Sequence, residues 1–444
     1  MSCTAAQPGI LEAIASYIDE KTFFTTITSV TFAVLFLFLY ILHAYTFFDK
    51  NNIKDCATPA APFGNLNDVI FHKDSWYMFL RKHYNRLKRK KLPFGGLYLF
   101  FKPSILISDQ ILIERLILSQ KENNEVLDTL FTKDVMQNTL EKIDSIYDEC
   151  NELLNKQPCD RILNHFFVKT ARLLFGFSID DTKLENSMKG KSYSCFKHYL
   201  GVAYSCFKSK NIYSHITASI QQELQNRKKN DIKHSDILHN LTKIDSNVIE
   251  NLSEIFIENI LFSTLSTMLC LYELSQDDTI QEELVGEIRR LFAKKGKMQF
   301  QYLDHLPYME AVVKETLRKW PPVPVEVIQN NQEVEGLPNN KNILLLLSIY
   351  GMQNHPDNFV DPEQYDPDRF LEDNVRETLF MPFGIGPQRD INHRLTTMNI
   401  KLALIWILSK YKVKIQPSYH LELDKTKVII QPKVVVPLQF ELID

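Results

Sequence analysis

Apolar positions are most concentrated near the start of the chain, where residues 22–48 contain no side chain that is formally charged at pH 7. About 20 consecutive apolar residues are enough for a helix to span a bilayer, so this pattern predicts a transmembrane anchor. A cleaved signal peptide is the alternative, but its apolar part covers only about 7–15 residues and follows a basic flank. Here the flank carries Glu12, Asp19 and Glu20, which favours the anchor.

Basic residues follow this segment much more densely than they precede it. Only Lys21 lies directly before it, whereas Lys50 and Lys54 lie directly after it and seven Lys or Arg residues fall between positions 81 and 91. Because the positive flank stays in the cytosol, the pattern predicts a luminal segment at residues 1–21 and a cytosolic body at residues 49–444. The basic run could contact anionic head groups, although a solvated helix face is the more common meaning of such a run.

Beyond the anchor, the spacing of apolar residues indicates short strands and long helices. Residues 97–101 and 104–108 flank Lys102-Pro103 in the pattern of a strand, a turn and a strand. From position 111 to position 292 apolar residues recur mostly every three or four positions, which is typical of helices. Residues 427–436 are rich in β-branched side chains and predict a late strand. The expected fold class is therefore mainly α with a minor β portion.

Composition limits the classes to which the chain can belong. Its 444 residues are 45% hydrophobic and no Gly-, Ser- or Pro-rich linker divides them, so one large domain is expected after the anchor. A formal net charge of −3 provides no positive field that would attract nucleic acid, and we exclude that partner. Seven cysteines without a CxxC pair argue against a disulfide framework and against a zinc site.

Three segments in the last third of the chain carry most of the functional information. The first, residues 314–324, combines a helix with a proline stop. Glu315 and Arg318 are three positions apart, so their side chains emerge on one helix face and can form an ion pair. Glu287 and Arg290 repeat this spacing, and we interpret them as a surface pair.

The second and third segments follow in a fixed order. Residues 361–370 place Arg369 on a proline-stiffened loop, and residues 380–394 lead into a helix at 395–408. The three segments resemble the K-helix ExxR motif, the PxRF meander and the haem loop of the cytochrome P450 family. The anchor and the early hairpin resemble its microsomal, xenobiotic-oxidising members in insects and vertebrates, and the resemblance covers residues 22–440.

This resemblance implies the cytochrome P450 fold preceded by an N-terminal transmembrane helix. It also implies that Glu315, Arg318 and Arg369 form a buried triad that locks the core. A shared ion pair with several charge-assisted bonds can fix geometry even where it adds little net stability. We therefore expect these three residues to define the fold and to take no part in catalysis.

The resemblance further implies a haem, and Phe383, Gly384, Gly386 and Arg394 match the family's haem-binding loop. The axial cysteine of the family falls on Asp390. A thiolate pushes electron density toward iron-bound oxygen, whereas a carboxylate is a hard oxygen donor that is poorly suited to this task. Asp390 can instead cap the following helix, and we favour that role over metal ligation.

Other haem-binding features of the family are also altered. His393 is a nominal substitute ligand, but it lies three positions further on and we interpret it as a surface histidine. The arginine that pairs with a haem propionate falls on Gln388. The region after Gln120, which corresponds to helices B and C, is shortened relative to the family, so the haem is held less well than the family requires.

The oxygen-activation pattern of the family falls near residues 259–264, where Phe262 replaces the acid. Ser263 or Thr264 could still supply a catalytic hydroxyl, although proton delivery normally uses a titratable group as well. The alternative, which we favour, is that these hydroxyls bond back to their own helical turns.

Two hypotheses from different classes follow. By resemblance, the chain is a haem-dependent monooxygenase of small lipophilic substrates that takes electrons from a flavoprotein reductase at the cytosolic face of the endoplasmic reticulum membrane. We favour a member of this family whose activity is lost or impaired. The alternative is a haem-free, non-catalytic binding protein with a membrane anchor and a small lipophilic ligand, or a relic gene product.

Overall fold

The computed structural model describes residues 20–119, 132–154, 156–180, 184, 214–230, 234–241, 249–295, 299–331, 333–372, 375–385 and 389–443. Most of the predicted luminal segment, Gly386, Gln388 and the shortened region after Gln120 lie outside the described residues.

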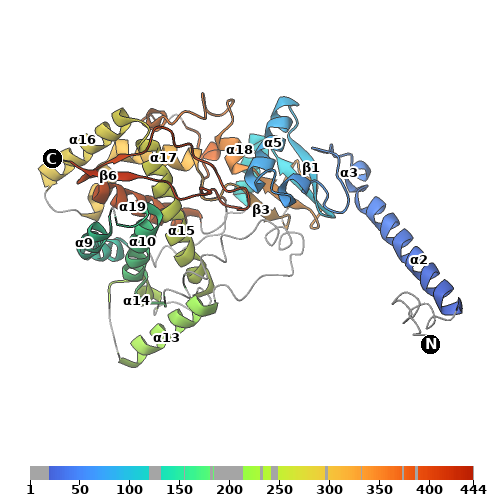
Figure 1. The fold of residues 1–444 in the computed structure, drawn as a ribbon, viewed down its shortest axis with the longest axis horizontal. Helices are drawn as coiled ribbons and strands as arrows, with labels where there is room; N and C mark the ends of the chain where they lie inside the picture. Colours follow the sequence, from blue (N-terminus) through green and yellow to red (C-terminus); the bar gives the residue numbers. More distant parts are fainter. Residues whose placement is uncertain are drawn as a thin grey trace, which may run out of the picture.

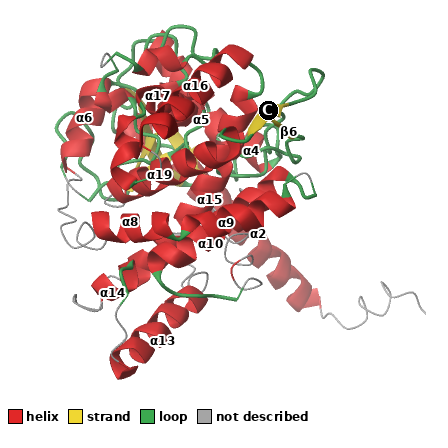
Figure 2. Ribbon diagram, turned by 90° about the vertical axis from the view of Figure 1, so that its left-hand side faces the viewer, coloured by secondary structure: helices red, strands yellow, loops and turns green. Residues whose placement is uncertain are grey.

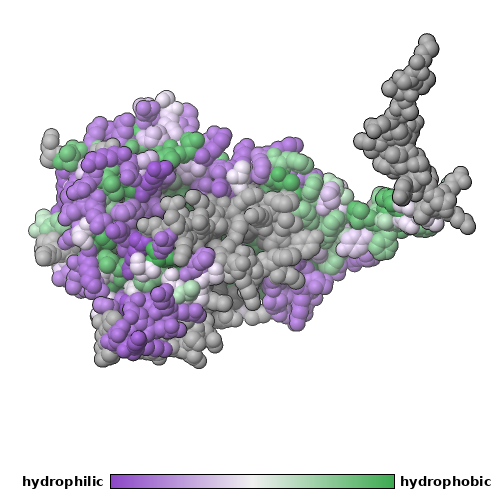
Figure 3. Space-filling model, turned by 60° about the horizontal axis from the view of Figure 1, so that its bottom comes forward, coloured by the Kyte–Doolittle hydropathy of each residue, from purple (hydrophilic) through white to green (hydrophobic). Residues whose placement is uncertain are grey.

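An exposed apolar helix leads into the body of the molecule. Helix α2 (Glu20–Ala44) projects away from the remaining elements, and its Phe24–Ile41 window has a mean hydropathy of 2.0 with none of it buried (Figure 1). The helix ends four residues before the predicted limit of 48, and a short helix α3 (Phe47–Lys50) follows. In the space-filling view the side chains on this arm are largely hydrophobic, while the visible surface of the body is mostly hydrophilic (Figure 3).

A four-stranded sheet lies next to the end of this arm. Its order is β1-β2-β4-β3, formed by β1 (Phe94–Leu99), β2 (Lys102–Ile107), β4 (Leu344–Leu347) and β3 (Glu326–Gln329). β2 pairs with β1 antiparallel and with β4 parallel, starting from Ser104 opposite Leu344. The sheet therefore joins two parts of the chain that are more than 200 residues apart.

The early hairpin is present, but its turn differs from the predicted one. Lys102 and Pro103 belong to β2, and the turn lies at Phe100 and Phe101, with Phe100 in the left-handed region at φ 56°. Pro103 is compatible with the strand because pairing of β2 with β4 begins only at Ser104, so the missing proline N–H is not required there.

The strand predicted at residues 427–436 is wrong. Within this stretch only Lys427 and Pro432 are bridge residues, with Pro432 paired to Leu423, and the late two-stranded sheet consists of β5 (Tyr411–Lys414) and β6 (Gln439–Leu442). Pro432 and Pro437 lack backbone donors, so a regular ladder cannot run through the segment despite its β-branched composition.

Helices make up most of the body, as predicted, and they surround the long helix α15 (Ile249–Leu274). Figure 2 shows α15 between α19 (Arg389–Leu408) and α10 (Cys159–Phe175). Although α15 is apolar and long enough to cross a membrane, 83% of its apolar window is buried, so it is a core helix. The other helices are α4 (Asn67–Ile70), α5 (Trp76–Arg89), α6 (Gln110–Ser119), α8 (Lys133–Glu141), α9 (Ile143–Leu153), α13 (Ser214–Asn230), α14 (Ile237–Leu241), α16 (Asp278–Lys295), α17 (Pro307–Lys319) and α18 (Ile349–Gln353), with 3₁₀ turns η2 (Phe300–His305), η3 (Pro367–Phe370) and η4 (Glu377–Leu379).

The pair Glu287 and Arg290 is not a surface pair. Arg290 is exposed, but Glu287 is 8% exposed and its carboxylate accepts hydrogen bonds from the backbone N–H groups of Tyr308 (2.9 Å) and Met309 (2.8 Å). These donors are in the first turn of α17, whose N–H groups have no partner within the helix. Glu287 therefore caps α17 from the neighbouring helix α16.

Candidate functional site

The predicted ion pair on α17 is fully buried. The Arg318 guanidinium donates to both carboxylate oxygens of Glu315, from Nε at 2.6 Å and from Nη2 at 2.8 Å. It also donates to the carbonyl oxygens of Gln353 (2.9 Å) and Pro362 (2.9 Å). Burial raises the pKa of Glu315, although the bonds from Arg318 act in the opposite direction. The pair thus joins the end of α17 to α18 and to the loop that follows it.

Arg369 lies beside the same carboxylate. Its Nε is 3.5 Å from Glu315 Oε1, and its guanidinium also donates to the carbonyl oxygen of Asp361 at 3.2 Å. The backbone N–H of Asp366 donates to Glu315 Oε1 at 2.9 Å. The three residues expected to form a triad are therefore brought together.

Gln353, which the sequence analysis did not identify, connects this network to the candidate haem loop. Its side-chain amide donates to the carbonyl oxygens of Leu317 (3.0 Å) and Arg318 (2.9 Å) and accepts from the backbone N–H of Met381 (2.8 Å). Gln353 is fully buried at the end of α18. The position of the loop is thus tied to the end of α17.

One of the predicted loop residues, Gly384, lies next to a carboxylate, while Phe383 contacts other rings. Gly384 has a φ of 81°, and a β-carbon there would overlap the carboxylate of Glu326. Burial of this carboxyl group raises the pKa of Glu326 to about 7, and the nearby Glu258 carboxylate acts in the same direction. Only glycine fits this position, because of both the backbone conformation and the close approach of Glu326.

Asp390, at the ligand position, points into solvent. It lies in the first turn of α19 with its side chain 87% exposed, and its Oδ1 is 3.8 Å from Arg389 Nε. A carboxylate in the first turn complements the helix dipole. Arg394, one turn further along, is also exposed.

His393 is half-buried and is not the surface residue that we expected. Its ring contacts Phe383 edge-on with centroids 5.6 Å apart, and burial is the largest cause of its lowered pKa. His393 lies near the start of α19 with its ring facing the loop, whereas the side chain of the adjacent Arg394 is exposed.

The two hydroxyls expected on α15 differ in their partners. Thr264 donates to the carbonyl oxygen of Ile260 in its own helix at 2.8 Å. Ser263 accepts a hydrogen bond from the Asn399 side chain of α19 at 3.0 Å, and Asn399 also donates to Asn259 at 3.2 Å. Ser263 therefore takes part in a buried contact between two helices, while Thr264 bonds back to its own turn.

The distance between the oxygen-activation segment and the ligand loop can be compared with the space that a haem bound as in the family requires. An axial thiolate and the oxygen that it activates occupy opposite faces of the porphyrin. Two van der Waals contacts of about 3.5 Å each require about 7 Å between the heavy atoms on the two faces. Phe262, at the oxygen-activation position, and Phe383, on the ligand loop, have ring centroids only 6.1 Å apart, so these residues do not fit a haem between them.

The charges beside the loop lead to the same conclusion. Glu326 and Glu258 place acidic groups beside the loop, whereas haem propionates need cationic partners. Glu258 also accepts a hydrogen bond from Asn392 of α19 at 2.7 Å. The four cysteines within the described residues, at positions 56, 150, 159 and 270, are buried and outside the loop.

Comparisons with known proteins identify relatives along the chain. A family model described as Cytochrome P450 matches residues 192–437. The chain is 23% identical over 509 residues to the probable cytochrome P450 6d5 of Drosophila melanogaster, covering 92% of this chain and 98% of that protein. It is 33% identical over 191 residues to cytochrome P450 6k1 of Blattella germanica, covering 40% and 36% respectively. It is 32% identical over 157 residues to cytochrome P450 3A28 of Bos taurus, covering 34% and 31%.

Proposed function

This chain belongs to the cytochrome P450 family, and on that premise we propose that it is a degenerate member whose monooxygenase activity is lost or impaired. The family consists of haem-dependent monooxygenases that normally work with a redox reductase at the endoplasmic reticulum membrane. Their chemistry depends on a thiolate bound to the haem iron.

The observation that carries the proposal is Asp390 at the ligand position. Its exposed carboxylate has the negative charge of a thiolate without the soft, polarisable donor atom. The contact between Phe262 and Phe383 supports the same proposal, because these rings take up the space between the two functional segments.

Within this proposal, the predicted site residues have structural roles. Glu315, Arg318 and Arg369 fix the end of α17 against the following loop, which keeps the family's fold without its cofactor. The hydroxyl groups of Ser263 and Thr264 form hydrogen bonds between and within helices. Phe262 lies where the family has an acid, so no titratable side chain at that position can deliver a proton.

The proposed location is the endoplasmic reticulum membrane, with a single span at α2 and the body in the cytosol. The exposed apolar surface of α2 and the basic residues that follow it support this topology. The resemblance of the anchor and the early hairpin to microsomal members of the family supports the choice of membrane.

Reconstitution tests the proposed loss of activity. The full chain is produced with a haem precursor, then assayed with a flavoprotein reductase, NADPH and 7-ethoxycoumarin as a lipophilic probe. We expect no dealkylation above the level of reductase alone. Turnover by the unmodified chain would contradict the proposal.

A series of variants distinguishes the effect of the missing cysteine ligand from the effect of the contact between Phe262 and Phe383. We expect Asp390→Cys alone to leave haem uptake low, because the contact between Phe262 and Phe383 remains. Phe262→Ala combined with Asp390→Cys should take up more haem than either single variant. Full uptake by Asp390→Cys alone would show that the ring contact does not exclude haem.

A second candidate function, a haem-free binding protein, is favoured by a cavity beside α19, which His393 also lines. This cavity has a volume of about 350 Å³ and combines apolar side chains with charged ones. Its lining includes Met136, Phe300, Leu303 and Met398. In a titration with a fluorescent fatty acid, Met398→Trp should abolish binding, whereas Met78→Trp, at a partly exposed position on α5, should leave it unchanged.

A further inference from the structure

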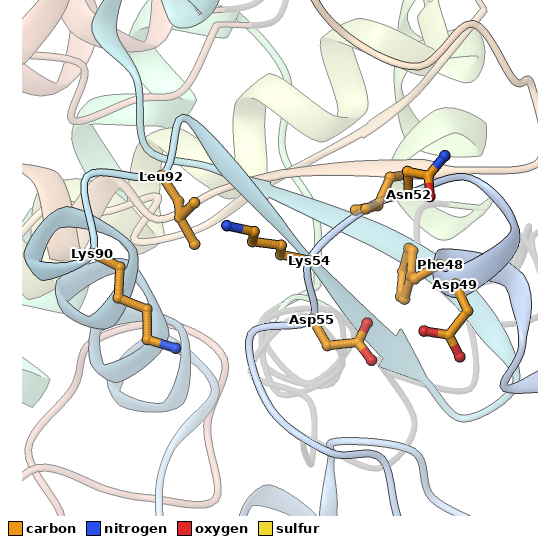
Figure 4. A pocket seen from close by; sticks show the side chains of 8 residues that line it. Phe48, Asp49, Asn52, Lys54, Asp55, Lys90 and Leu92 are labelled. Atoms are coloured by element: carbon orange, nitrogen blue, oxygen red, sulfur yellow. The ribbon is translucent and has the colours of Figure 1, made fainter.

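A second pocket lies where the anchor meets the body, and we call it the junction pocket. It has a volume of about 790 Å³ and lies between the residues that follow α3 and the end of α5. Figure 4 shows its lining from close by, formed by Phe48, Asp49, Asn52, Ile53, Lys54, Asp55, Lys90 and Leu92.

Side-chain contacts fix this pocket relative to the anchor. Tyr45 packs edge-on against Tyr98 of β1 with ring centroids 5.0 Å apart and also contacts Phe101 at 5.7 Å. Phe48, which is 1% exposed, packs on Tyr98 at 4.5 Å, and its backbone N–H donates to the Tyr98 hydroxyl at 3.2 Å. These contacts hold one side of the pocket against β1, next to the end of α2.

The pocket lies directly beyond the end of the apolar helix. Phe48 follows Ala44, the last residue of α2, by four positions, and the apolar window ends three residues before Ala44, at Ile41. If α2 spans the membrane, the residues directly after it emerge into the polar head-group layer. The lining of the pocket therefore begins next to lipid head groups.

The charges in the pocket are balanced and unpaired. It contains two carboxylates, Asp49 and Asp55, and two ammonium groups, Lys54 and Lys90. Within the described residues, none of the four forms an ion pair with an opposite charge. In Figure 4 the Asp49 and Asp55 carboxylates lie on one side of the pocket, and the Lys54 and Lys90 ammonium groups lie on the other.

The proximity of the Asp49 and Asp55 carboxylates favours binding of a cation. Partial burial and the neighbouring Asp49 raise the pKa of Asp55 to about 6. Two acids that share a small space repel each other, and a positive group between them relieves this repulsion. The ammonium groups of Lys54 and Lys90 provide the complementary site for an anion.

We propose that the junction pocket binds the head group of a zwitterionic phospholipid with a primary amine, such as phosphatidylethanolamine. The lipid phosphate lies near Lys54 and Lys90, and its ammonium donates hydrogen bonds to Asp49 and Asp55. A quaternary amine has no N–H group to donate, so the carboxylates select the primary amine. This inference rests on the proposed membrane anchoring.

Native mass spectrometry of the full chain in detergent tests the selection. The probes are dihexanoyl phosphatidylethanolamine, phosphatidylcholine and phosphatidylglycerol, with inorganic phosphate as a fourth. We expect the ethanolamine lipid to bind roughly tenfold more tightly than the choline lipid, the factor that corresponds to one good charge-assisted bond. Equal binding of these two lipids, preference for phosphatidylglycerol, or equally tight binding of phosphate would overturn the proposal.

Paired variants assign the binding to the four charged residues. Asp49→Asn with Asp55→Asn should reduce binding of the ethanolamine lipid to the level of the choline lipid. Lys54→Gln with Lys90→Gln should weaken both. Lys91→Gln, which removes a neighbouring charge outside the lining, should change neither. Ethanolamine selectivity that survives the double Asp variant would overturn the assignment, and unchanged thermal melting shows that each variant is folded.

Liposome flotation tests membrane anchoring independently of head-group binding in the junction pocket. A chain that binds the ethanolamine lipid in detergent but does not float with liposomes would contradict the anchor and leave the pocket in place. A chain that floats without lipid selectivity would contradict the pocket alone.

Discussion

At the scale of single residues, buried charges are held by the backbone as well as by each other. Arg318 divides its donors between one carboxylate and the carbonyl oxygens of Gln353 and Pro362. The sequence predicted that Glu315 and Arg318 meet, because a three-residue spacing on a helix brings side chains together. It could not predict Gln353, because its partners in α17 and at Met381 are 28 or more positions away and no local pattern indicates such contacts.

Glu315→Gln should destabilise the protein strongly. The substitution leaves the fully buried Arg318 without a counter-charge, and breaking a buried pair in this way costs about 3–5 kcal/mol. Chemical unfolding of the full chain in detergent measures the loss. Glu282→Gln is the matched control, because Glu282 is 71% exposed and its pair with Lys412 should contribute less than about 1 kcal/mol. Similar losses for both variants would contradict the account.

His83 should make stability depend on pH. It is 6% exposed on α5, and burial lowers its pKa to about 4. In the unfolded chain, histidine takes up a proton near pH 6.5, so the unfolded state gains protons first as the pH falls. The free energy of unfolding should therefore decrease between about pH 6.5 and pH 4, by up to about 3 kcal/mol from this residue.

A comparison with His83→Gln isolates this contribution, because other histidines also titrate in this range. Unfolding free energies are measured at intervals between pH 7.5 and pH 4.5. The variant should show a shallower pH dependence whatever its stability at neutral pH. An identical slope in both proteins would mean that His83 is not protected from protons in the fold.

At the scale of elements, the same spacing of three positions between a glutamate and an arginine leads to two different sets of contacts. In α17 it forms an internal ion pair, while in α16 it leaves Arg290 exposed and turns Glu287 toward the start of α17. Spacing gives the face of a helix but not the neighbour that the face contacts. The predicted strand at 427–436 was wrong for a similar reason, because β propensity does not reveal where prolines interrupt pairing.

Alanine substitutions distinguish these two residues of α16. Glu287→Ala leaves two N–H groups of α17 without their acceptor and should cost about 1–3 kcal/mol. Arg290→Ala changes an exposed side chain and should stay within about 0.5 kcal/mol of the unmodified protein. Thermal unfolding followed by circular dichroism compares them, and a larger loss for Arg290→Ala would contradict the capping role.

At the scale of the whole molecule, the described residues keep the arrangement that the three motifs predict, whereas we propose that they no longer hold a haem. The motifs at 314–324, 361–370 and 380–394 predicted the fold because their contacts lock the ends of α17 and α18. The sequence also led us to place Asp390 at the position of the family's axial cysteine. It could not show that Phe262 and Phe383, which are 121 positions apart, contact each other, because that contact depends on how α15 packs against the loop.

The haem content of the purified full chain, expressed with ample haem precursor, tests the central claim most directly. The account predicts a folded, monodisperse protein with no stoichiometric Soret absorbance and no thiolate-type shift on reduction and addition of carbon monoxide. One tightly bound haem per chain with that shift would contradict it.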